Sequence, residues 1–304
     1  MIVSTLPFIK LLSVIANQFH LKLPKFIINS NIFIAIAAVS LTLATQAQLG
    51  LHPRIHAYHA LIFFAVVLDY NFHRFMKMIR FPGTFRSEKY EWASGHVFTI
   101  KVLIGLSLAG LAATLFFVSF KTYCFLGLLA AITVSYSLPV HLKRKYNFRI
   151  TESACMKSIL ISLVWTAATI FIVILNDSKS FNTRHLLLLS IERFLFIFAI
   201  TIPFDIRDTA DDIRAGIRTI PIIYGPERAM QISNIAMISA LIIAIGHYLT
   251  TNMMFIALAF FVSVASTLFF TNSKQLKLLP FYYHVILDSC IVLHGILICA
   301  SYFL

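Results

Sequence analysis

One polar stretch of the chain reads Asp205-Ile-Arg-Asp208-Thr-Ala-Asp211-Asp212-Ile-Arg-Ala-Gly216-Ile-Arg-Thr219-Ile-Pro221, and it directly follows a largely apolar run, residues 186–204. The chain contains only 12 acidic residues, and four of them fall within the eight positions from 205 to 212. On a helix, Asp205, Asp208 and Asp212 share one face because they are spaced at i, i+3 and i+7. Three carboxylates on one face repel each other unless a cation lies among them.

The residue types in this stretch allow two interpretations. Carboxylate oxygens are hard ligands that suit Mg²⁺, which leaves its remaining positions to water and substrate phosphate. Asp211 lies off the shared face, and we expect it to pair with an arginine. The arginines interleaved with the acids could pair with them or with phosphate: Arg207, Arg214 and Arg218. On spacing alone, a metal–phosphate site and a salt-bridged helix surface are equally open.

The composition indicates an integral membrane protein. The chain is 59% hydrophobic and 12% charged, with a mean hydropathy of +0.86, which is outside the range of soluble domains. The net charge of +13 fits basic loops that face anionic lipid and the cytoplasm, rather than a nucleic-acid partner. The four cysteines lie in or beside apolar runs without metal-ligand spacing, so we expect reduced packing residues: Cys124, Cys155, Cys290 and Cys299.

Apolar runs of the length that crosses a bilayer, about 20 residues, recur along the chain. They predict an all-α integral membrane fold, a bundle of about nine transmembrane helices in a single domain, residues 26–304. Residues 1–25 are mixed in character and predict an N-terminal interfacial segment. The predicted spans are 26–45, 55–75, 96–119, 122–139, 155–175, 185–204, 228–249, 253–271 and 281–303.

The distribution of basic residues predicts the orientation. With these nine spans, 18 Lys and Arg residues fall on one side of the membrane and 4 on the other. The positive-inside rule then places the N-terminus and the acidic stretch in the cytoplasm and the C-terminus outside, in an inner or plasma membrane. Chemistry that needs polar groups is therefore expected at the cytoplasmic face, in a site that opens into the bundle.

Two motifs resemble those of a known family, the UbiA superfamily of intramembrane prenyltransferases, over roughly residues 26–303. Lys157 and Trp165 fit the segment that follows the fourth helix in that family. The tyrosine- and proline-containing end of that helix is similar to Ser135-Tyr136-Ser137-Leu138-Pro139, followed by Lys143 and Arg144. The family's second aspartate-rich motif resembles Asp205-x-x-Asp208-x-x-x-Asp212-x-x-x-Gly216-x-x-Thr219-x-Pro221-x-x-x-Gly225.

The resemblance implies a helical bundle around a central cavity, in which a prenyl group moves from a prenyl diphosphate to an aromatic or other lipophilic acceptor. Two aspartate-rich motifs hold Mg²⁺, and the metal holds the diphosphate. Breaking an allylic C–O bond leaves charge on the departing diphosphate, which Mg²⁺ and basic side chains stabilise. An apolar cavity shelters the carbocation from water. The implied partners are a prenyl diphosphate, a lipophilic acceptor and membrane lipid.

The first aspartate-rich motif departs from the family pattern, Asn-Asp-x-x-Asp at the end of the second helix. The corresponding stretch is Val67-Leu-Asp69-Tyr70-Asn-Phe-His73-Arg74. Aligned on Arg74, the three motif positions are occupied by Asp69, Tyr70 and His73, and in every register at most one acid remains. Losing carboxylates from one wall should weaken metal binding.

Three interpretations stay open. The chain is an active enzyme that uses Asp69, Asn71 and His73 in place of the usual acids; or it binds another phosphorylated or neutral lipid and does other chemistry; or it is a non-catalytic relative that binds or transports an isoprenoid lipid. The retained acidic stretch favours the first, a UbiA-type prenyltransferase.

For an active enzyme, the resemblance implies three groups of site residues. The expected ligands of Mg²⁺ are Asp69, Asp205, Asp208 and Asp212. The expected catalytic residues are Asp69, His73 and Asp208. The residues expected to bind the diphosphate are Arg74, Tyr136, Lys143, Lys157, Arg207 and Arg218.

Other ionisable residues fall inside the predicted spans, where an unpaired charge is costly. Glu192 and Arg193 are expected to pair with polar groups across the bundle. Asp288, in the last span, either lines the cavity and orients an acceptor hydroxyl or is a hydrogen-bonded polar group between helices.

Overall fold

The described part of the computed structural model is helical throughout, and it covers residues 22–80, 83, 88–137, 156–214, 216–279 and 282–304. It contains no strand within those ranges, which confirms the all-α fold class. The helices are α2 (Lys22–Asn29), α3 (Ile32–Gln48), α4 (Ala57–Arg80), α5 (Glu88–Gly95), α6 (Val97–Thr114), α7 (Phe120–Ser137), α8 (Met156–Leu175), α9 (Thr183–Arg207), α10 (Thr209–Arg214), α11 (Ile220–Tyr224), α12 (Pro226–Thr250), α13 (Met254–Asn272), η2 (Leu276–Leu278), η3 (Tyr282–Leu287) and α14 (Asp288–Ser301).

The long helices support an integral membrane protein. In the described residues, six helical segments are long and apolar enough to cross a bilayer, namely α6, α8, α9, α12, α13 and the continuous segment of η3 and α14. Shorter apolar stretches lie in α3 and α7, and α4 combines an apolar half with a charged end. Each predicted span overlaps one long helix, while the count of nine spans stays a prediction.

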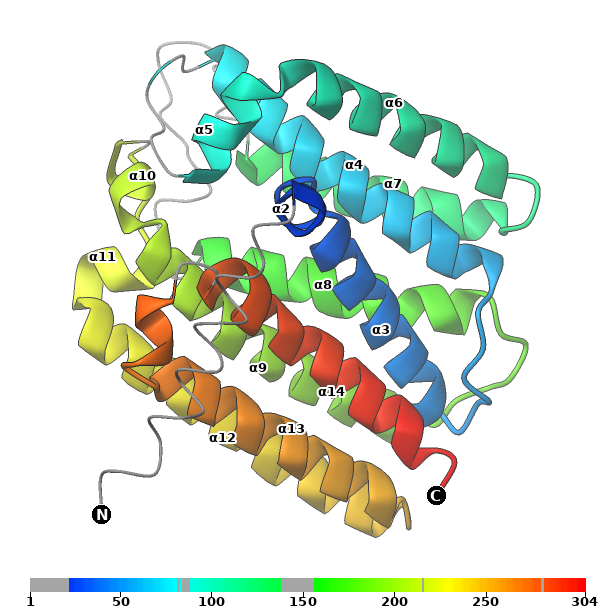
Figure 1. The fold of residues 1–304 in the computed structure, drawn as a ribbon. Helices are drawn as coiled ribbons and strands as arrows, with labels where there is room; N and C mark the ends of the chain where they lie inside the picture. The colour runs from blue at the N-terminus through cyan, green and yellow to red at the C-terminus, as the bar shows by residue number, and fades with distance from the viewer. Residues whose placement is uncertain (1–21, 81–82, 84–87, 138–155, 215, 280–281) are drawn as a thin grey trace, which may run out of the picture.

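The long helices run side by side, and α3 lies centrally among them (Figure 1). It packs against α4, α8 and α14, so segments from the start, middle and end of the chain meet on one helix. The short helices α5, α10 and α11 and the turn η2 gather at one end of the bundle, on the left of Figure 1. We call this end, to which the acidic stretch belongs, the cavity end.

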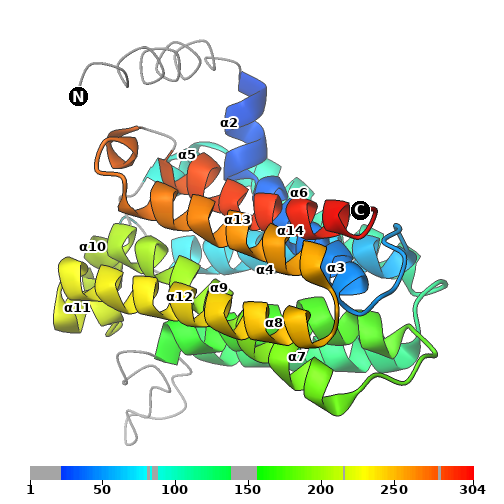
Figure 2. The same ribbon diagram turned by 90° about the horizontal axis from the view of Figure 1, so that it is seen from below.

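The first predicted span, 26–45, is wrong as a continuous helix. It is broken at Ser30–Asn31, and α2 lies across the direction of the long helices (Figure 2). Asn31 has a φ of 64°, a left-handed conformation that asparagine tolerates better than most residues. Asn71 of α4 holds the break, since its amide donates to the Ser30 carbonyl at 2.9 Å and its oxygen accepts from the Asn31 amide at 3.1 Å.

A buried polar network closes the bundle at the opposite end. Arg193 donates to the Gln48 side chain at 2.6 Å, and Glu192 accepts from Gln48 at 3.1 Å and from the hydroxyl of Tyr248. His247 Nδ1 lies 3.2 Å from Glu192 Oε2. All five side chains are buried, as charges inside a membrane bundle require. The expectation that Glu192 and Arg193 pair across the bundle is confirmed.

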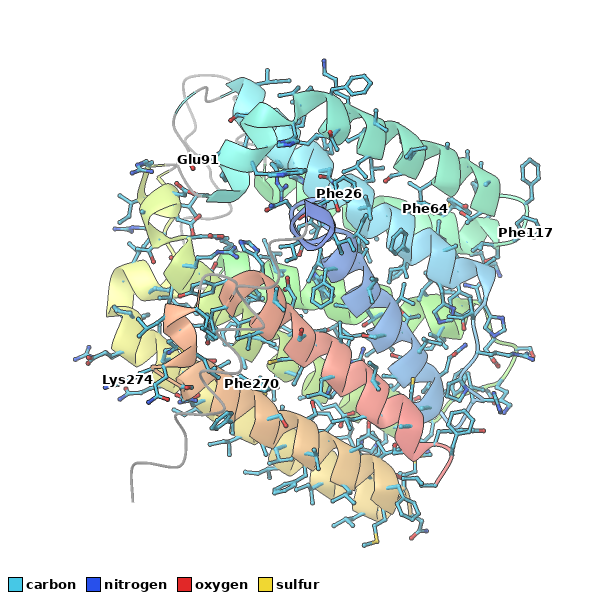
Figure 3. All side chains as sticks on the ribbon, viewed as in Figure 1. Phe26, Phe64, Glu91, Phe117, Phe270 and Lys274 are labelled. Carbon is cyan, nitrogen blue, oxygen red and sulfur yellow. The ribbon has the colours of Figure 1, made fainter. Side chains whose placement is uncertain are left out.

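Large apolar side chains cover much of the outer surface. Phe117, between α6 and α7, is 77% exposed and projects from the bundle (Figure 3). Exposing such large apolar side chains is unfavourable in water, whereas the hydrocarbon of a lipid bilayer solvates them well. The surface therefore agrees with the composition in indicating a membrane protein.

Gly295→Ala is expected to destabilise the bundle, because α14 approaches α3 closely at Gly295. A methyl group there would lie 2.6 Å from the Cβ of Ser40 and 2.7 Å from its backbone carbonyl carbon. Backbone cannot swing aside, so the two helices must move apart, at a cost of about 1–3 kcal/mol. The measurement is the thermal unfolding midpoint in detergent.

Gly246→Ala in α12 is the matched control. No described atom outside its own helix backbone lies within 4 Å of a Cβ at Gly246, so alanine should raise helix stability by up to about 1 kcal/mol. If both variants unfolded at the wild-type temperature, the close approach of α3 and α14 would be contradicted.

Candidate functional site

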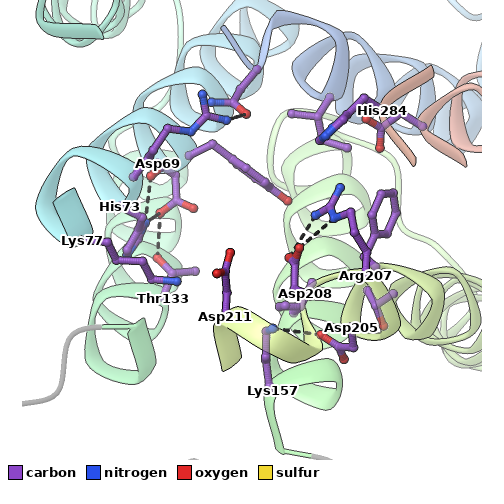
Figure 4. A pocket seen from close by; sticks show the side chains of 18 of the residues that line it. Asp69, His73, Lys77, Thr133, Lys157, Asp205, Arg207, Asp208, Asp211 and His284 are labelled. Atoms are coloured by element: carbon purple, nitrogen blue, oxygen red, sulfur yellow. Dashed lines mark hydrogen bonds and ion pairs between the residues drawn. The ribbon is translucent and has the colours of Figure 1, made fainter. Parts of the chain in front are cut away.

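A cavity of about 300 Å³ opens at the cavity end of the bundle (Figure 4). Six of the chain's 12 acids line it, and they come from four separate segments. Basic side chains line it as well. In a chain so poor in charge, this concentration makes the cavity the candidate functional site. The acids are Asp69, Asp205, Asp208, Asp211, Asp212 and Asp288, and the basic residues are His73, Arg74, Lys77, Lys157, Arg207 and His284.

The acidic stretch does not form one helix. Helix α9 ends at Arg207, Asp208 occupies its C-cap, and α10 begins at Thr209. The backbone N–H of Asp212 still donates to the Asp208 carbonyl at 2.8 Å, so the turn is nearly helical across the break. Asp205, Asp208 and Asp212 therefore face one cavity, as their spacing predicts, although they lie on two helices.

Lys157 of α8 lies between two of these acids. Its Nζ is 2.9 Å from Asp205 Oδ1 and 2.7 Å from Asp212 Oδ2. Ser158 donates to the other oxygen of Asp205 at 2.6 Å. Burial raises the pKa of Asp212, while the ammonium of Lys157 acts in the opposite direction. Lys157 therefore neutralises two acids of the site, and its expected role in binding the diphosphate stays a prediction.

Asp208 is held by its neighbour. Arg207 donates to Asp208 through Nε at 2.7 Å and through Nη2 at 3.0 Å, a two-point contact that fixes both groups. The guanidinium carbon of Arg207 also lies 5.1 Å from the ring centre of Phe204 and 5.5 Å from that of Tyr283, within the range of cation–π attraction.

Asp211 is a cavity residue, which corrects its expected place off the site. One oxygen accepts from Arg214 at 3.2 Å, so the expected arginine pairing is confirmed. The other, Oδ2, is buried and has no hydrogen-bond partner in the described part of the chain. The carboxylate points into the cavity in Figure 4. A buried acceptor without a donor is costly, so Asp211 has an oxygen ready for a cation or a donor.

The opposite wall belongs to α4 and α7. Asp69 Oδ1 accepts from the hydroxyl of Thr133 at 3.0 Å and lies 3.2 Å from His73 Nδ1. Figure 4 places Asp69, His73 and Lys77 on the wall that faces Asp208 and Asp211. With Arg74, which also lines the cavity, this wall carries one carboxylate and three basic side chains, in agreement with the altered first motif.

Of the other residues predicted to bind the diphosphate, one lines the cavity, one lies away from it and two have side chains outside the described part of the chain. Arg74 lines the cavity, but it donates to the Asn29 carbonyl and, at 2.8 Å, to the Asn31 side chain, which ties α4 to the α2–α3 break. Arg218 is exposed and is not among the lining residues that the structure describes. Lys143 and the side chain of Tyr136 lie outside the described residues.

Several residues that line the cavity or contact its acids were missed from the sequence. Lys77 could have been found, because it follows Asp69 and His73 at intervals of four on the same helix face. Ser158 and Thr133, which donate to the acids, carry no such signal, since serine and threonine are common in membrane helices.

The oxygen-rich donor set suits Mg²⁺ in its chemistry, and the free Asp211 oxygen faces the cavity. Nevertheless, within the described ranges no three Asp, Glu, His or Cys side chains converge as a ready metal cluster. Lys157 and Arg207 already contact three of the acids. The residues present therefore fit a metal ion that is held by one or two carboxylates and whose remaining positions are filled by a bound phosphate.

The fold and the site together define a helical integral membrane protein with an acid-rich cavity at one end of its bundle. The chain belongs to the UbiA prenyltransferase family, which matches residues 93–279. No curated protein matches the sequence.

Solved structures share this fold. A UbiA homolog from Aeropyrum pernix K1, in an apo structure, is 17% identical with a TM-score of 0.58, over 88% of this chain and 96% of that one. A UbiA homolog from Archaeoglobus fulgidus bound to DMAPP and Mg²⁺ is 15% identical with a TM-score of 0.59, over 91% of this chain and 99% of that one. The same homolog bound to GPP and Mg²⁺ gives a TM-score of 0.59 and 15% identity, over 90% and 99%. These likenesses confirm the predicted UbiA-like fold.

Lys157→Met is expected to destabilise the protein by about 3–5 kcal/mol, because it leaves two buried carboxylates facing each other without a cation. Adding Asp212→Asn should recover part of the loss, since it removes one of the two charges. Thermal unfolding of the single and double variants measures both effects.

Arg214→Met is the control for an ion pair of the same stretch. The Arg214 side chain is 43% exposed, so its pair with Asp211 should contribute no more than about 1 kcal/mol. Equal losses for Lys157→Met and Arg214→Met would contradict a special role of Lys157.

Proposed function

We propose that the protein transfers a prenyl group from a prenyl diphosphate to a lipophilic acceptor, with diphosphate departure assisted by Mg²⁺. The observation that carries this proposal is the convergence of six acids and several basic side chains on one cavity of a UbiA-family bundle. The A. fulgidus homolog of the same fold was solved with DMAPP or GPP together with Mg²⁺, which supports a similar use of this cavity.

An apolar pocket adjoining the polar cavity supports an isoprenoid substrate. It has a volume of about 100 Å³ and is otherwise lined mainly by aliphatic side chains of α3, α4, α7 and α8. The two spaces share five lining residues: Asp69, Tyr70, Thr133, Val164 and Trp165. A diphosphate at the polar cavity would thus place its hydrocarbon chain in this pocket, away from water.

Carboxylates from both walls of the cavity would bind the metal ion. Asp208 and Asp211 on one wall and Asp69 on the other would hold Mg²⁺, with Asp205 and Asp212 available if Lys157 moves aside. Bound Mg²⁺ would supply charge neutralisation at the diphosphate.

Basic side chains would act on the same group directly. Lys77 and His73 would stabilise the negative charge that develops on the diphosphate. Arg207 would fix the orientation of Asp208, and the apolar walls would exclude water from the allylic cation.

A rival function is isoprenoid binding or transport without turnover. It is favoured by the single carboxylate on the α4 wall and by the ion pairs that already engage three acids. Turnover separates the two proposals, since a carrier would bind the donor but release no diphosphate.

Geranyl diphosphate together with Mg²⁺ should raise the unfolding temperature of the purified protein, and EDTA should remove most of this shift. The reason is that the metal links the diphosphate to the cavity carboxylates. Absence of any shift, with or without Mg²⁺, would refute both the transferase and the carrier.

Asp208→Asn should lower Mg²⁺-dependent diphosphate release by about 100-fold or more, because it removes a carboxylate ligand of the Mg²⁺ that would neutralise the leaving diphosphate. The assay is diphosphate release from geranyl diphosphate in membranes supplied with lipophilic acceptors. Glu227→Gln, at an exposed acid in the first turn of α12, is the control and should retain the wild-type rate. An unchanged rate in Asp208→Asn would falsify this role.

A further inference from the structure

Asp288 is a buried carboxyl group that the diphosphate machinery does not use. Its residue is 9% exposed and lines the polar cavity together with His284, one turn earlier. No described residue donates a hydrogen bond to its carboxylate or forms an ion pair with it, whereas each other acid of the cavity has such a partner.

The backbone before Asp288 is unusual. Residues Tyr282–Leu287 form a π-helical turn, and the α-helix begins at Asp288. A π turn widens a helix by one residue and is common at functional sites, because it redirects a side chain at some cost in backbone stability. Here it lies directly before the carboxyl group that faces the cavity.

Besides its charged residues, the cavity that Asp288 lines has apolar and weakly polar walls. Thr201 and Phe204 of α9, Ile34 of α3 and Trp165 of α8 contribute apolar or weakly polar walls to the same cavity. Arg207 also lines it, but Asp208 holds two of its nitrogens. A carboxylate in this setting needs a hydrogen-bond donor, and a lipophilic ligand with a hydroxyl group supplies one.

We propose that Asp288 is the acceptor-site carboxylate: it binds the hydroxyl group of a neutral lipophilic acceptor and takes its proton during transfer. This inference rests on the proposed prenyltransferase function. An acceptor that carries its own carboxylate is disfavoured, because two like charges would meet in a cavity of low dielectric.

Atoms and electrons are conserved in the proposed transfer. The allylic C–O bond to the diphosphate breaks, and its electron pair leaves with the diphosphate. A new bond forms from the acceptor to the allylic carbon, at the hydroxyl oxygen or at a ring carbon conjugated with it. The acceptor loses one proton, and Asp288 receives it, so that the group acts as a general base.

The test compares two acceptors, 4-methylphenol and 4-hydroxybenzoate, with geranyl diphosphate and Mg²⁺ as donor. The wild-type protein should prenylate the neutral phenol, and Asp288→Asn should lower this rate by about 100-fold or more, the usual loss of a general base. Donor binding, read from the thermal shift with geranyl diphosphate, should stay unchanged. Asp288→Asn should also reduce the preference for 4-methylphenol over 4-hydroxybenzoate by about tenfold or more, because the repelling charge is gone.

Ser289→Ala is the matched control, since Ser289 is the next residue of the same helix and lies outside the described lining. It should keep the wild-type rate and preference. Three results would overturn the proposal for Asp288 alone: full activity of Asp288→Asn, loss of donor binding in that variant, or donor binding by the wild type without transfer to 4-methylphenol. Failure of the wild type to bind geranyl diphosphate would overturn the proposed function as well.

Discussion

The ammonium of Lys157, placed between the carboxylates of Asp205 and Asp212, is the interaction on which the cavity depends. Two acids buried side by side at a membrane boundary would repel each other and resist desolvation. The lysine turns this repulsion into attraction, and it joins α8 to α9 and α10. Ser158 from the same turn fixes Asp205 a second time. The other two acids of the stretch, Asp208 and Asp211, therefore lie on a wall of the cavity whose position is set by contacts with α8.

The two ends of the bundle differ in how their buried charged groups are paired. At the closed end, Glu192 and Arg193 find partners within the protein, so the network locks helices together and leaves little for a ligand to bind. At the cavity end, Asp211 retains a free oxygen and the carboxylate of Asp288 has no described donor. In a low-dielectric interior, polar groups without a hydrogen-bond partner are costly. They are tolerated where a ligand supplies the missing partner. This contrast distinguishes the buried charged groups that stabilise the fold from those for which we propose a role in the site.

The altered first motif changes the electrostatics of the opposite wall. Asp69 remains there, but it is engaged with His73 and Thr133, and Lys77 lies on the same helix face. A wall of this kind attracts phosphate directly, whereas a wall of carboxylates attracts it only through metal ions. In the proposed function, direct basic contacts with the diphosphate would compensate on this side for the loss of metal ligands. The acidic stretch lies on the other side, so the cavity is electrostatically asymmetric.

The sequence by itself determined the helical membrane class, the approximate positions of the long helices and the family. Hydropathy and spacing are local properties that one segment carries alone, and the spacing of Asp205, Asp208 and Asp212 already implied that they share a cavity. Only the tertiary structure decided the break at Ser30–Asn31, the partners of Lys157, and the entry of Asp211 and Asp288 into the site. Each of these depends on which helices are neighbours and how each is rotated about its axis. That rotation is set by long-range contacts such as those of Asn71, about 40 residues from Asn31, and no local pattern encodes it.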